Sequence, residues 1–501
     1  MRILLKGFVA DGINEPSRMA VLVENDVITA VEKDIYGASA ADLTLKFKDE
    51  IISPGFIDAH GHSDMSLLAA PEAESKRFQG VTCEITGNCG LSAFPVTENN
   101  REHLEALYAN YEVPITWNDL PGYQNALNAA KVKLRTFSLC GHNTLRAAAV
   151  GYEKQEISTD DQKKMAHLLE SALASGAPGL SSGLLYTPGC FADKGEIVSL
   201  MRILAAHDAV YATHLRSEGN SLLESLTETL DAASEAGLKK VLISHLKTAG
   251  KNNWHKLDAV FKLINDYRAQ GIDVRFDRYP YTESQTMLSV ILPPPFDTEP
   301  DRDITIKLQN PQLREELCRQ LALERTPEDW QRWRLTGTTH PKWKCFTGKK
   351  YSELPGPPEV AVIEQLQHDA TTATIGAAGM SEENMLRIIT SPLCLGGSDG
   401  NALPRSRRFG TAHPRAFGAI ARFIRLKLDH GISIGKTVNS VSGAAADFFS
   451  LKDTGIIQSG KKADLCVFAP EEIDSDADFI TPHLPACGVK LTMLDGEIEY
   501  Y

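Results

Sequence analysis

Eight short, continuous apolar runs recur along the chain, and helical stretches separate them. Continuous apolar character is typical of strands buried on both faces of a parallel sheet. The intervening stretches, such as DQKKMAHLLESALAS, repeat apolar residues every three or four positions, as amphipathic helices do. Eight such alternations predict an α/β fold with a (β/α)8 TIM-type barrel. The runs are IISPGFIDAHGH, GVTCEITGNC, KLRTFSLCGHN, GAPGLSSGLLY, AVYATHLRSE, KKVLISHLK, GIDVRFDRYPY and SPLCLGGSDG.

The two ends of the chain have a different pattern. Residues 1–52 alternate apolar and polar positions, and GIIQSGKKADLCVFAP and GVKLTMLDGEIEY do the same near the C-terminus. We therefore expect residues 1–52 and 451–501 to form one composite β-sandwich, which leaves 53–285 and 346–450 to the barrel.

A third region fits neither pattern. Residues 286–345 contain PPPF, many charges and three tryptophans, but no barrel-like run. We interpret them as a small insertion domain over the barrel mouth. TATIGAA, just beyond, predicts a further strand whose place the sequence leaves open.

Charge and cysteine content limit the class of protein. A net charge of -13 without any long run of lysine or arginine argues against nucleic-acid or membrane partners. No run reaches transmembrane length, and polar residues interrupt the apolar N-terminal stretch before a signal-peptide core can form. Nine scattered cysteines fit reduced thiols in a cytoplasmic protein. We expect a small-molecule partner, and the oligomeric state is left open.

Residues of the types that bind metals lie at the ends of the runs, where the active sites of barrels are found. His60 and His62 are two residues apart, so both face one side of an extended strand. Taken alone, His60 and His62 could be a hydrogen-bonded histidine pair, and an aspartate in GSDG could simply cap a turn. The repeated position instead favours one shared site. Four further candidates hold corresponding positions: Cys89, His214, His245 and Asp399.

Other candidates at similar positions are weaker. His142 and Asp277 also lie at strand ends, and we interpret them as hydrogen-bonding residues. Cysteine is among the most buried residue types. We therefore interpret four other cysteines as core or loop thiols: Cys140, Cys190, Cys394 and Cys466. From the residues alone, Cys89 could be a core thiol, a metal ligand, or a nucleophile with a neighbouring base.

Seven of these segments together resemble the D-aminoacylase family, the N-acyl-D-amino-acid deacylases of the amidohydrolase superfamily. They span essentially the whole chain in the family's order: GFIDAHGHSD, the GNCG loop, GLSSGLLY, THLRSEG, DRYPY, GSDG and HPR. The His-x-His and GSDG motifs are shared widely in the superfamily, whereas the cysteine is more particular to this branch. Many superfamily members bridge two metals with a carboxylated lysine. The fourth run here has no lysine, and the resemblance implies that the Cys89 thiolate replaces it.

The resemblance also implies a metal and a catalytic residue. Thiolate and imidazole together favour zinc, so Cys89, His214 and His245 would form one tight three-ligand site with an open position for water. His60 and His62 would hold a second, weaker metal ion on the other side of Cys89. Asp399 would take the proton of the water and return it to the departing amine.

Substrate contacts follow from motif positions. The resemblance assigns the α-carboxylate of the substrate to Lys247, Tyr279 and Arg415, although a lysine is most often simply solvated. The segment that precedes Arg415 is longer than usual, which leaves three other arginines, Arg405, Arg407 and Arg408, as competitors. No arginine or lysine lies between Tyr279 and Asp301, and the apolar LSVILPPPF segment favours neutral, hydrophobic D-amino acids.

The predicted function is zinc-dependent hydrolysis of N-acyl-D-amino acids to a D-amino acid and a carboxylate, with the insertion as a lid that excludes water. A cyclic-amide hydrolase of the dihydroorotase or hydantoinase type is the alternative, which the missing lysine and Cys89 disfavour. A noncatalytic amidohydrolase-like scaffold is the alternative from another class, and such a protein would usually have lost ligands.

Overall fold

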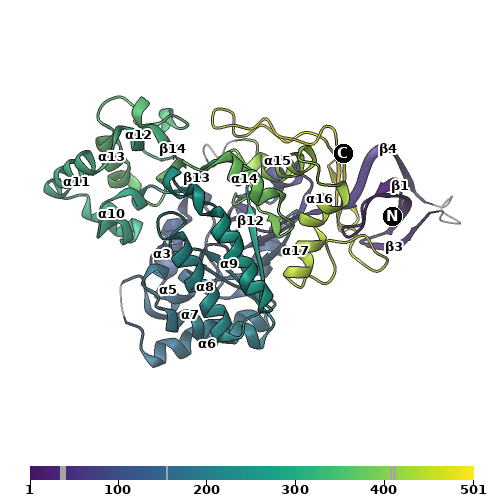
Figure 1. Ribbon diagram of the computed structural model, residues 1–501, viewed down its shortest axis with the longest axis horizontal. Helices are drawn as coiled ribbons and strands as arrows, with labels where there is room; N and C mark the ends of the chain where they lie inside the picture. Colours follow the sequence, from purple (N-terminus) through teal and green to yellow (C-terminus); the bar gives the residue numbers. More distant parts are fainter. Residues whose placement is uncertain (34–40, 154–155, 407–408, 410–412, 501) are drawn as a thin grey trace.

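The computed structural model describes residues 1–33, 41–153, 156–406, 409 and 413–500. Three parts follow one another along the long axis of the molecule (Figure 1). The insertion with helices α10 to α13 lies at one end, a barrel lies in the middle, and a sheet built from both chain ends lies at the other.

Eight parallel strands form the barrel, and they coincide with the eight predicted runs. The third run is interrupted at Leu139, so β7 pairs with β6 while β8 pairs with β9. The ring closes between the last and first strands, where the Ala59 N–H donates to the Gly396 carbonyl at 3.0 Å. The strands are β5 (Phe56–Asp58), β6 (Val81–Thr86), β7 (Arg135–Ser138) with β8 (Cys140–Gly141), β9 (Gly179–Gly183), β10 (Val210–His214), β11 (Lys240–Ile243), β12 (Asp273–Arg278) and β16 (Cys394–Gly396).

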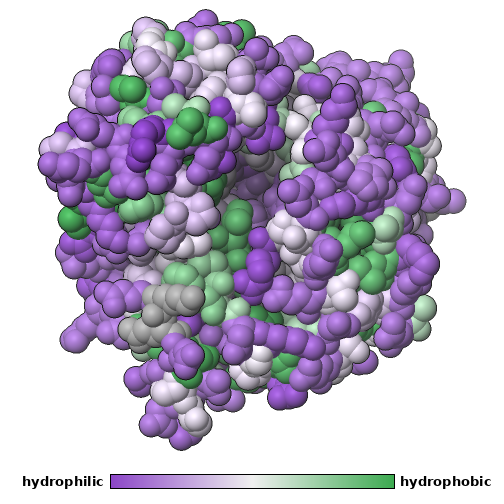
Figure 2. Space-filling model, turned by 60° about the vertical axis from the view of Figure 1, so that its left-hand side comes forward, coloured by the Kyte–Doolittle hydropathy of each residue, from purple (hydrophilic) through white to green (hydrophobic). Residues whose placement is uncertain are grey.

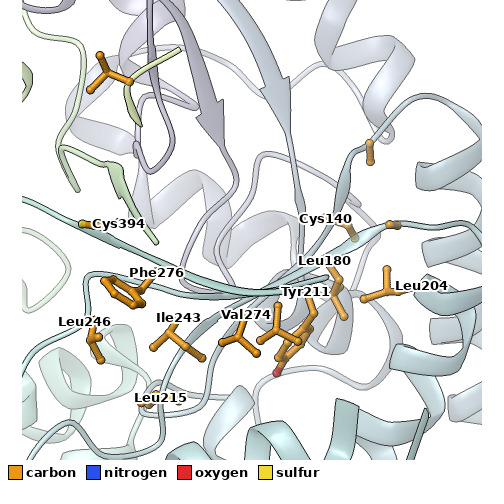
Figure 3. Packing of buried hydrophobic residues seen from close by; sticks show 14 of the residues in the cluster. Cys140, Leu180, Leu204, Tyr211, Leu215, Ile243, Leu246, Val274, Phe276 and Cys394 are labelled. Carbon is orange, nitrogen blue, oxygen red and sulfur yellow. The ribbon is translucent and has the colours of Figure 1, made fainter. Parts of the chain in front are cut away.

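Side chains alternate between two apolar layers along these strands, as the period of two in a strand requires. Ala212 and Leu242 pack inside the barrel, together with Phe448 and Phe449 from the end of α17. Tyr211 and Ile243 belong to the outer layer, which Figure 3 shows together with Leu204 of α7. The interior is therefore a packed core, and chemistry is confined to the strand ends.

Helices cover the outside of the barrel and its connections. The longest is α6, whose first turn is closed by a capping box between Ser158 and Asp161. No helix of the described residues is both long and apolar enough to span a membrane. The helices are α1 (Ser66–Ala69), α2 (Glu74–Arg77), α3 (Arg101–Leu107), α4 (Leu120–Ala129), α5 (His142–Val150), α6 (Thr159–Ala174), α7 (Lys194–Ala206), α8 (Leu222–Ala236), α9 (Leu257–Ala269), α14 (Glu382–Thr390), α15 (Arg415–Asp429), α16 (Ile434–Ser440) and α17 (Gly443–Phe448).

The two chain ends pair as predicted, in one seven-stranded sheet of order β19-β18-β17-β4-β1-β2-β3. Only β1 and β4 run parallel in it. The sheet curls until β3 meets the segment before β17, where the Ile28 N–H donates to the Lys461 carbonyl at 2.9 Å. One curled sheet thus encloses the apolar core of the composite sandwich. Its strands are β1 (Arg2–Val9), β2 (Ser17–Glu24), β3 (Val27–Glu32), β4 (Leu43–Pro54), β17 (Leu465–Phe468), β18 (Val489–Leu494) and β19 (Glu497–Tyr500).

The insertion has its own sheet and core. Strands β13 (Glu283–Met287), β15 (Thr374–Ala378) and β14 (Trp333–Gly337) pair antiparallel in that order, so TATIGAA supplies the central strand. All three tryptophans of the insertion pack in a cluster that extends to Ile375, well past the predicted limit at residue 345. The sequence could not show this, because α13 has an apolar face like that of a barrel helix. The helices are α10 (Asp301–Lys307), α11 (Pro311–Glu324), α12 (Pro327–Arg332) and α13 (Pro358–Asp369).

Candidate metal centre and active site

Candidate ligands from five barrel strands converge at the carboxyl end of the barrel. The ligand atoms of one buried group all lie within 4.8 Å of one another, and those of a second group meet the same limit. His245 belongs to both groups and links them. The first group is His60, Cys89, His245 and Asp399, and the second is His214, Glu218 and His245.

The backbone is strained where it presents three of these side chains. Cys89, His245 and Asp399 have positive φ angles of 52°, 37° and 52°. Such conformations cost a non-glycine residue about 1–3 kcal/mol and persist only where the surroundings hold them, typically at functional sites. Gly90 shows how tightly the Cys89 loop is held, because its φ is 77° and an added Cβ would lie 2.0 Å from Asn143 Oδ1.

Asp277 orients two of the histidines. Its Oδ2 lies 3.1 Å from His60 Nδ1, and its Oδ1 accepts a hydrogen bond from the His245 N–H at 2.9 Å. A carboxylate on Nδ1 directs the His60 Nε2 to the opposite side, where it lies 3.4 Å from Cys89 Sγ. This is how carboxylates orient histidine ligands in metal sites. Its hydrogen-bonding role agrees with the interpretation made from sequence.

Glu218 holds the other side of the centre, and the sequence analysis missed it. Its Oε1 lies 2.9 Å from His245 Nδ1, while His245 Nε2 lies 3.4 Å from Cys89 Sγ. Lys247 is 5% exposed and forms an ion pair with Glu218 at 2.5 Å. The predicted substrate-binding Lys247 therefore already has a carboxylate partner. Glu218 follows His214 by four residues in THLRSEG, which was the only signal in the sequence.

The surroundings of His214 fit a metal ion. Both of its ring nitrogens are buried, and neither has a hydrogen-bond partner among the residues that the structure describes. This imidazole lies beside a cysteine and a second imidazole. A metal ion bound there would accept the electron pair of one of its nitrogens. The donor set of sulfur, nitrogen and carboxylate oxygen suits zinc better than magnesium or calcium.

Electrostatics separate Cys89 from the other buried cysteines. Burial alone would raise its pKa, but His60 and His245 hold the pKa of the Cys89 thiol well below its usual range. At Cys140 and Cys394, burial raises the thiol pKa to about 12. This environment favours the thiolate of Cys89, which is the form of cysteine that binds metals.

Asp399 lies between the metal ligands and an arginine. Its Oδ1 lies 3.0 Å from His62 Nε2, and its Oδ2 accepts a hydrogen bond from Arg415 Nη1 at 2.6 Å. Burial opposes ionisation, but Arg415 and His245 keep the pKa of this carboxyl well below its usual range. Asp399 is therefore an ionised carboxylate at neutral pH.

The predicted carboxylate-binding residues stand beside it. Tyr279 has a fully buried hydroxyl without a hydrogen-bond partner in the described part of the chain, and the Arg415 guanidinium lies 5.2 Å from its ring centroid. Arg405 instead packs over the Phe78 ring, and Arg407 and Arg408 lie outside the described residues.

These groups open into a cavity of about 420 Å³ between the barrel and the insertion. Figure 2, in which the insertion side of the molecule comes forward, shows a deep hollow in this face. Metal-ligand candidates, Tyr279 and Arg415 line one part of the cavity. The rest is lined by barrel loops with Leu91, Leu107 and Leu185, by strand β13, and by the segment 297–301.

The barrel, with candidate metal ligands at its strand ends, is typical of metal-dependent amidohydrolases. No family model matches the chain. A D-aminoacylase from Alcaligenes xylosoxydans xylosoxydans is 32% identical over 99% of this chain and 93% of its own length. Two solved structures resemble the fold, each over 99% of this chain and 96% of the other. One is the N-acyl-D-glutamate deacylase from Bordetella bronchiseptica with zinc and a phosphonate mimic of the tetrahedral intermediate, with TM-score 0.82 and 27% identity. The other is a D-aminoacylase described for its binuclear metal centre, with TM-score 0.81 and 30% identity.

The chain therefore belongs to the D-aminoacylase family of N-acyl-D-amino-acid deacylases. This confirms the resemblance inferred from the sequence.

Proposed function

We propose that this protein hydrolyses N-acyl-D-amino acids to a D-amino acid and a carboxylate, with zinc in the centre described above. The observation that carries the proposal is the buried Cys89 side chain, whose sulfur lies 3.4 Å from one nitrogen of each of two oriented histidines. The zinc and the phosphonate mimic in the Bordetella relative support the same reaction.

The ligands divide into two sets. Cys89, His214 and His245 would hold the tighter zinc ion, because neither ring nitrogen of His214 has a hydrogen-bond partner among the described residues and Glu218 lies 2.9 Å from His245 Nδ1. His60 and His62 would hold a second, weaker ion with Cys89. When bound, the metal polarises the amide carbonyl and lowers the pKa of a water toward neutrality.

Asp399 would move the proton. Its Oδ1 faces His60 and His62, so this oxygen is placed to accept a proton from a water in the centre. Arg415 holds the other oxygen and fixes the orientation of the carboxylate. Asp399 would then return the proton to the amide nitrogen, because an amine leaves far more readily than an amide anion.

Substrate orientation would come from three residues. The Tyr279 hydroxyl has no hydrogen-bond partner among the described residues and could donate to the α-carboxylate. Arg415 uses Nη1 for Asp399, and its other N–H groups could bind the substrate. Lys247 would add positive charge, although its ammonium already forms an ion pair with Glu218. A carboxylate fixed in this way would decide which enantiomer presents its amide to the metal centre.

The cavity would favour apolar substituents. Leu91, Leu107, Met287 and Val290 line it, and the described part of the insertion places no arginine or lysine in its wall. We therefore place neutral, hydrophobic D-amino acids ahead of acidic ones. The insertion would act as a lid, since Tyr186 Oη of the barrel loop lies 3.0 Å from Thr286 Oγ1 of β13.

We also place the enzyme in the cytoplasm. Buried cysteines such as Cys140 and Cys394 are protonated, because burial raises their pKa, and such free thiols suit a reducing compartment. Its partner would be the small-molecule substrate, as in the relatives.

The experiment that tests the function compares matched N-acetyl-D- and N-acetyl-L-amino acids on metal-analysed protein, alongside Asp399→Asn. Zinc-dependent release of the D-amino acid, with a loss of at least about 10³-fold in kcat in the variant, is expected. Zinc binding with no hydrolysis of either enantiomer would reject the substrate class and direct attention to cyclic amides. Absence of stoichiometric zinc, with indifference to Asp399→Asn, would indicate a scaffold.

A further inference from the structure

We propose that the cavity selects N-acyl-D-amino acids that carry a cationic group at the end of an apolar arm. This inference rests on the proposed deacylase function and refines its substrate class. It keeps the apolar preference argued above but replaces the neutral end of the arm with a positively charged one.

The carboxylates that would meet the cation come from one short segment. Residues 297–301 connect the insertion to its helix α10, and Asp297, Glu299 and Asp301 all line the cavity. Two contacts fix this segment against the barrel: the Thr187 hydroxyl donates to the Thr298 carbonyl, and Arg302 Nη2 lies 2.6 Å from Glu102 Oε1 of α3. The acidic wall is thus part of the assembled cavity.

Most of the nearby positive charge is already paired. Lys307 forms an ion pair with Glu299 at 2.6 Å, and Arg302 is bound to Glu102. Asp301 differs, because its carboxyl interacts with the Ser289 hydroxyl but its buried Oδ1 has no hydrogen-bond partner among the described residues. A buried carboxylate oxygen without a partner is costly unless a ligand supplies the donor.

The titration of neighbouring groups agrees with a missing cation. Burial raises the pKa of Asp301 to about 7; a hydrogen bond with Ser289 opposes this rise, and the nearby Asp369 adds a smaller contribution to it. A bound ammonium would lower it again and recover the charged form. His103, which also lines the cavity, adds no competing charge, because burial and Arg302 lower its pKa to about 4.

The wall between the two charged regions is apolar. Leu91 follows Cys89 by two residues, while Leu107 belongs to α3, the helix that Arg302 contacts. Met287 and Val290 line the same cavity from the insertion. A substrate that matches this wall has an α-carboxylate for Arg415, an apolar stem, and a cation for Asp297 and Asp301.

Two substrate arms can supply this chemistry. A basic side chain, as in D-lysine, would place the ammonium four carbons from Cα, and an ω-amino acyl group would place it on the other side of the scissile amide. The shared feature is an ammonium at the end of an alkyl stem, and the choice of arm is an outcome of the test.

The test uses substrate pairs that differ mainly in the charged group. Nα-acetyl-D-lysine is compared with Nα-acetyl-D-norleucine, and 6-aminohexanoyl-D-leucine with hexanoyl-D-leucine, on zinc-loaded protein at pH 8. We expect the cationic member of one pair to have about 10- to 100-fold higher kcat/KM, the value of one charge-assisted hydrogen bond. That pair identifies the arm.

Variants tie the preference to the wall. Asp301→Asn should bring the ratio close to one while leaving the neutral substrate within about twofold, and Asp297→Asn should lower it partway. Asp303→Asn is the matched control, because this α10 residue carries the same charge but does not line the cavity. Thermal unfolding of each variant checks that it folds.

Two results would overturn the proposal. If neutral substrates are hydrolysed and neither pair favours its cationic member, the deacylase function stands and the charged wall has no part in selection. A preference that survives both cavity variants would also reject it. If no substrate of either pair is hydrolysed, the deacylase function itself fails, and this inference fails with it.

Discussion

At the scale of single residues, Cys89 shows what a sequence leaves undecided. A cysteine after a buried strand is equally compatible with a core thiol, a nucleophile and a ligand. The structure narrows the choice, because His60 and His245 both face its sulfur while Asp277 and Glu218 hold their other nitrogens. Neither histidine is arranged as a free base for a nucleophile.

Replacing this thiolate tests its role directly. We expect Cys89→Ala to lose bound zinc and at least about 10³-fold of kcat, because a three-ligand site retains too few donors. Metal analysis after gel filtration and steady-state kinetics measure the two effects, with Cys190→Ala, a loop cysteine, as control. A variant that keeps full zinc but loses activity would instead identify Cys89 as a nucleophile.

Tyr279 gives a second prediction at this scale. Tyr279→Phe should raise KM by about tenfold and change kcat less, because it removes one hydrogen bond to a charged substrate group. Tyr281→Phe is the matched control, since its hydroxyl is also buried but does not line the cavity. Equal effects of the two substitutions on KM would contradict a substrate contact at Tyr279.

The positions of candidate ligands could be predicted from the sequence where the place along a strand decides them. The ends of the apolar runs indicated His60, His214 and His245, because strand ends meet at one face of a barrel. Partners such as Glu218 were missed, since a loop conformation brings its carboxylate to His245 and no periodic pattern encodes that.

At the scale of elements, the barrel strands and the presence of an insertion were predictable, but the extent of the insertion was not. Strands buried on both faces give long apolar runs. The insertion instead combines short strands with amphipathic helices, so α13 and β15 could not be assigned to it before their packing was known. For this reason the prediction ended the insertion at residue 345, whereas its core extends further.

Helix α10 supports a prediction about stability and pH. In the unfolded chain the Asp301 carboxyl ionises near its ordinary pKa of 3.8, whereas burial raises the folded value to about 7. The folded state therefore binds more protons between these values, and its stability falls as pH rises through them. Above pH 7 the penalty is complete.

Removing the carboxyl should remove that penalty. Asp301→Asn should leave stability near pH 4 unchanged and increase it by about 1–2 kcal/mol at pH 8. Thermal unfolding of both proteins across this range measures the difference, with Asp303→Asn as the control. A loss of stability at pH 8 would show that the ionised carboxylate has a stabilising partner.

At the scale of the whole molecule, the active site depends on contacts between distant segments. The barrel closes between residues near 60 and 400, and both His60 and Asp399 lie on this seam, where the Asp399 N–H donates to the His60 carbonyl at 2.7 Å. Residues of the insertion line the cavity. The sheet built from both chain ends lies at the opposite end of the molecule from the insertion (Figure 1). The sequence predicted the order of the strands, but not the contacts that hold the first and last strands together.

A buried lysine holds the seam. Lys76 Nζ lies 2.7 Å from Asp58 Oδ2 and 3.4 Å from Glu84 Oε2, and it donates to the Gly400 carbonyl at 3.0 Å. One ammonium thus joins the first, second and last strands, and the four residues Lys76, Asp58, Glu84 and Ser398 are fully buried. No sequence pattern indicated this contact, because Lys76 lies in the short helix α2.

Removing this ammonium should damage fold and site together. Lys76→Met leaves two buried carboxylates without their cation, so we expect a loss of about 3–5 kcal/mol of stability, with weaker zinc binding because His60 and Asp399 lose their common support. Lys427→Met is the control: this lysine is also buried, but its Nζ donates to the Ile389 carbonyl and burial lowers its pKa. Adding Glu84→Gln to Lys76→Met should recover part of the stability, because one unpaired charge disappears. Denaturant unfolding and zinc titration decide the matter, and equal losses in the two lysine variants would mean that the seam needs only the bulk of a side chain.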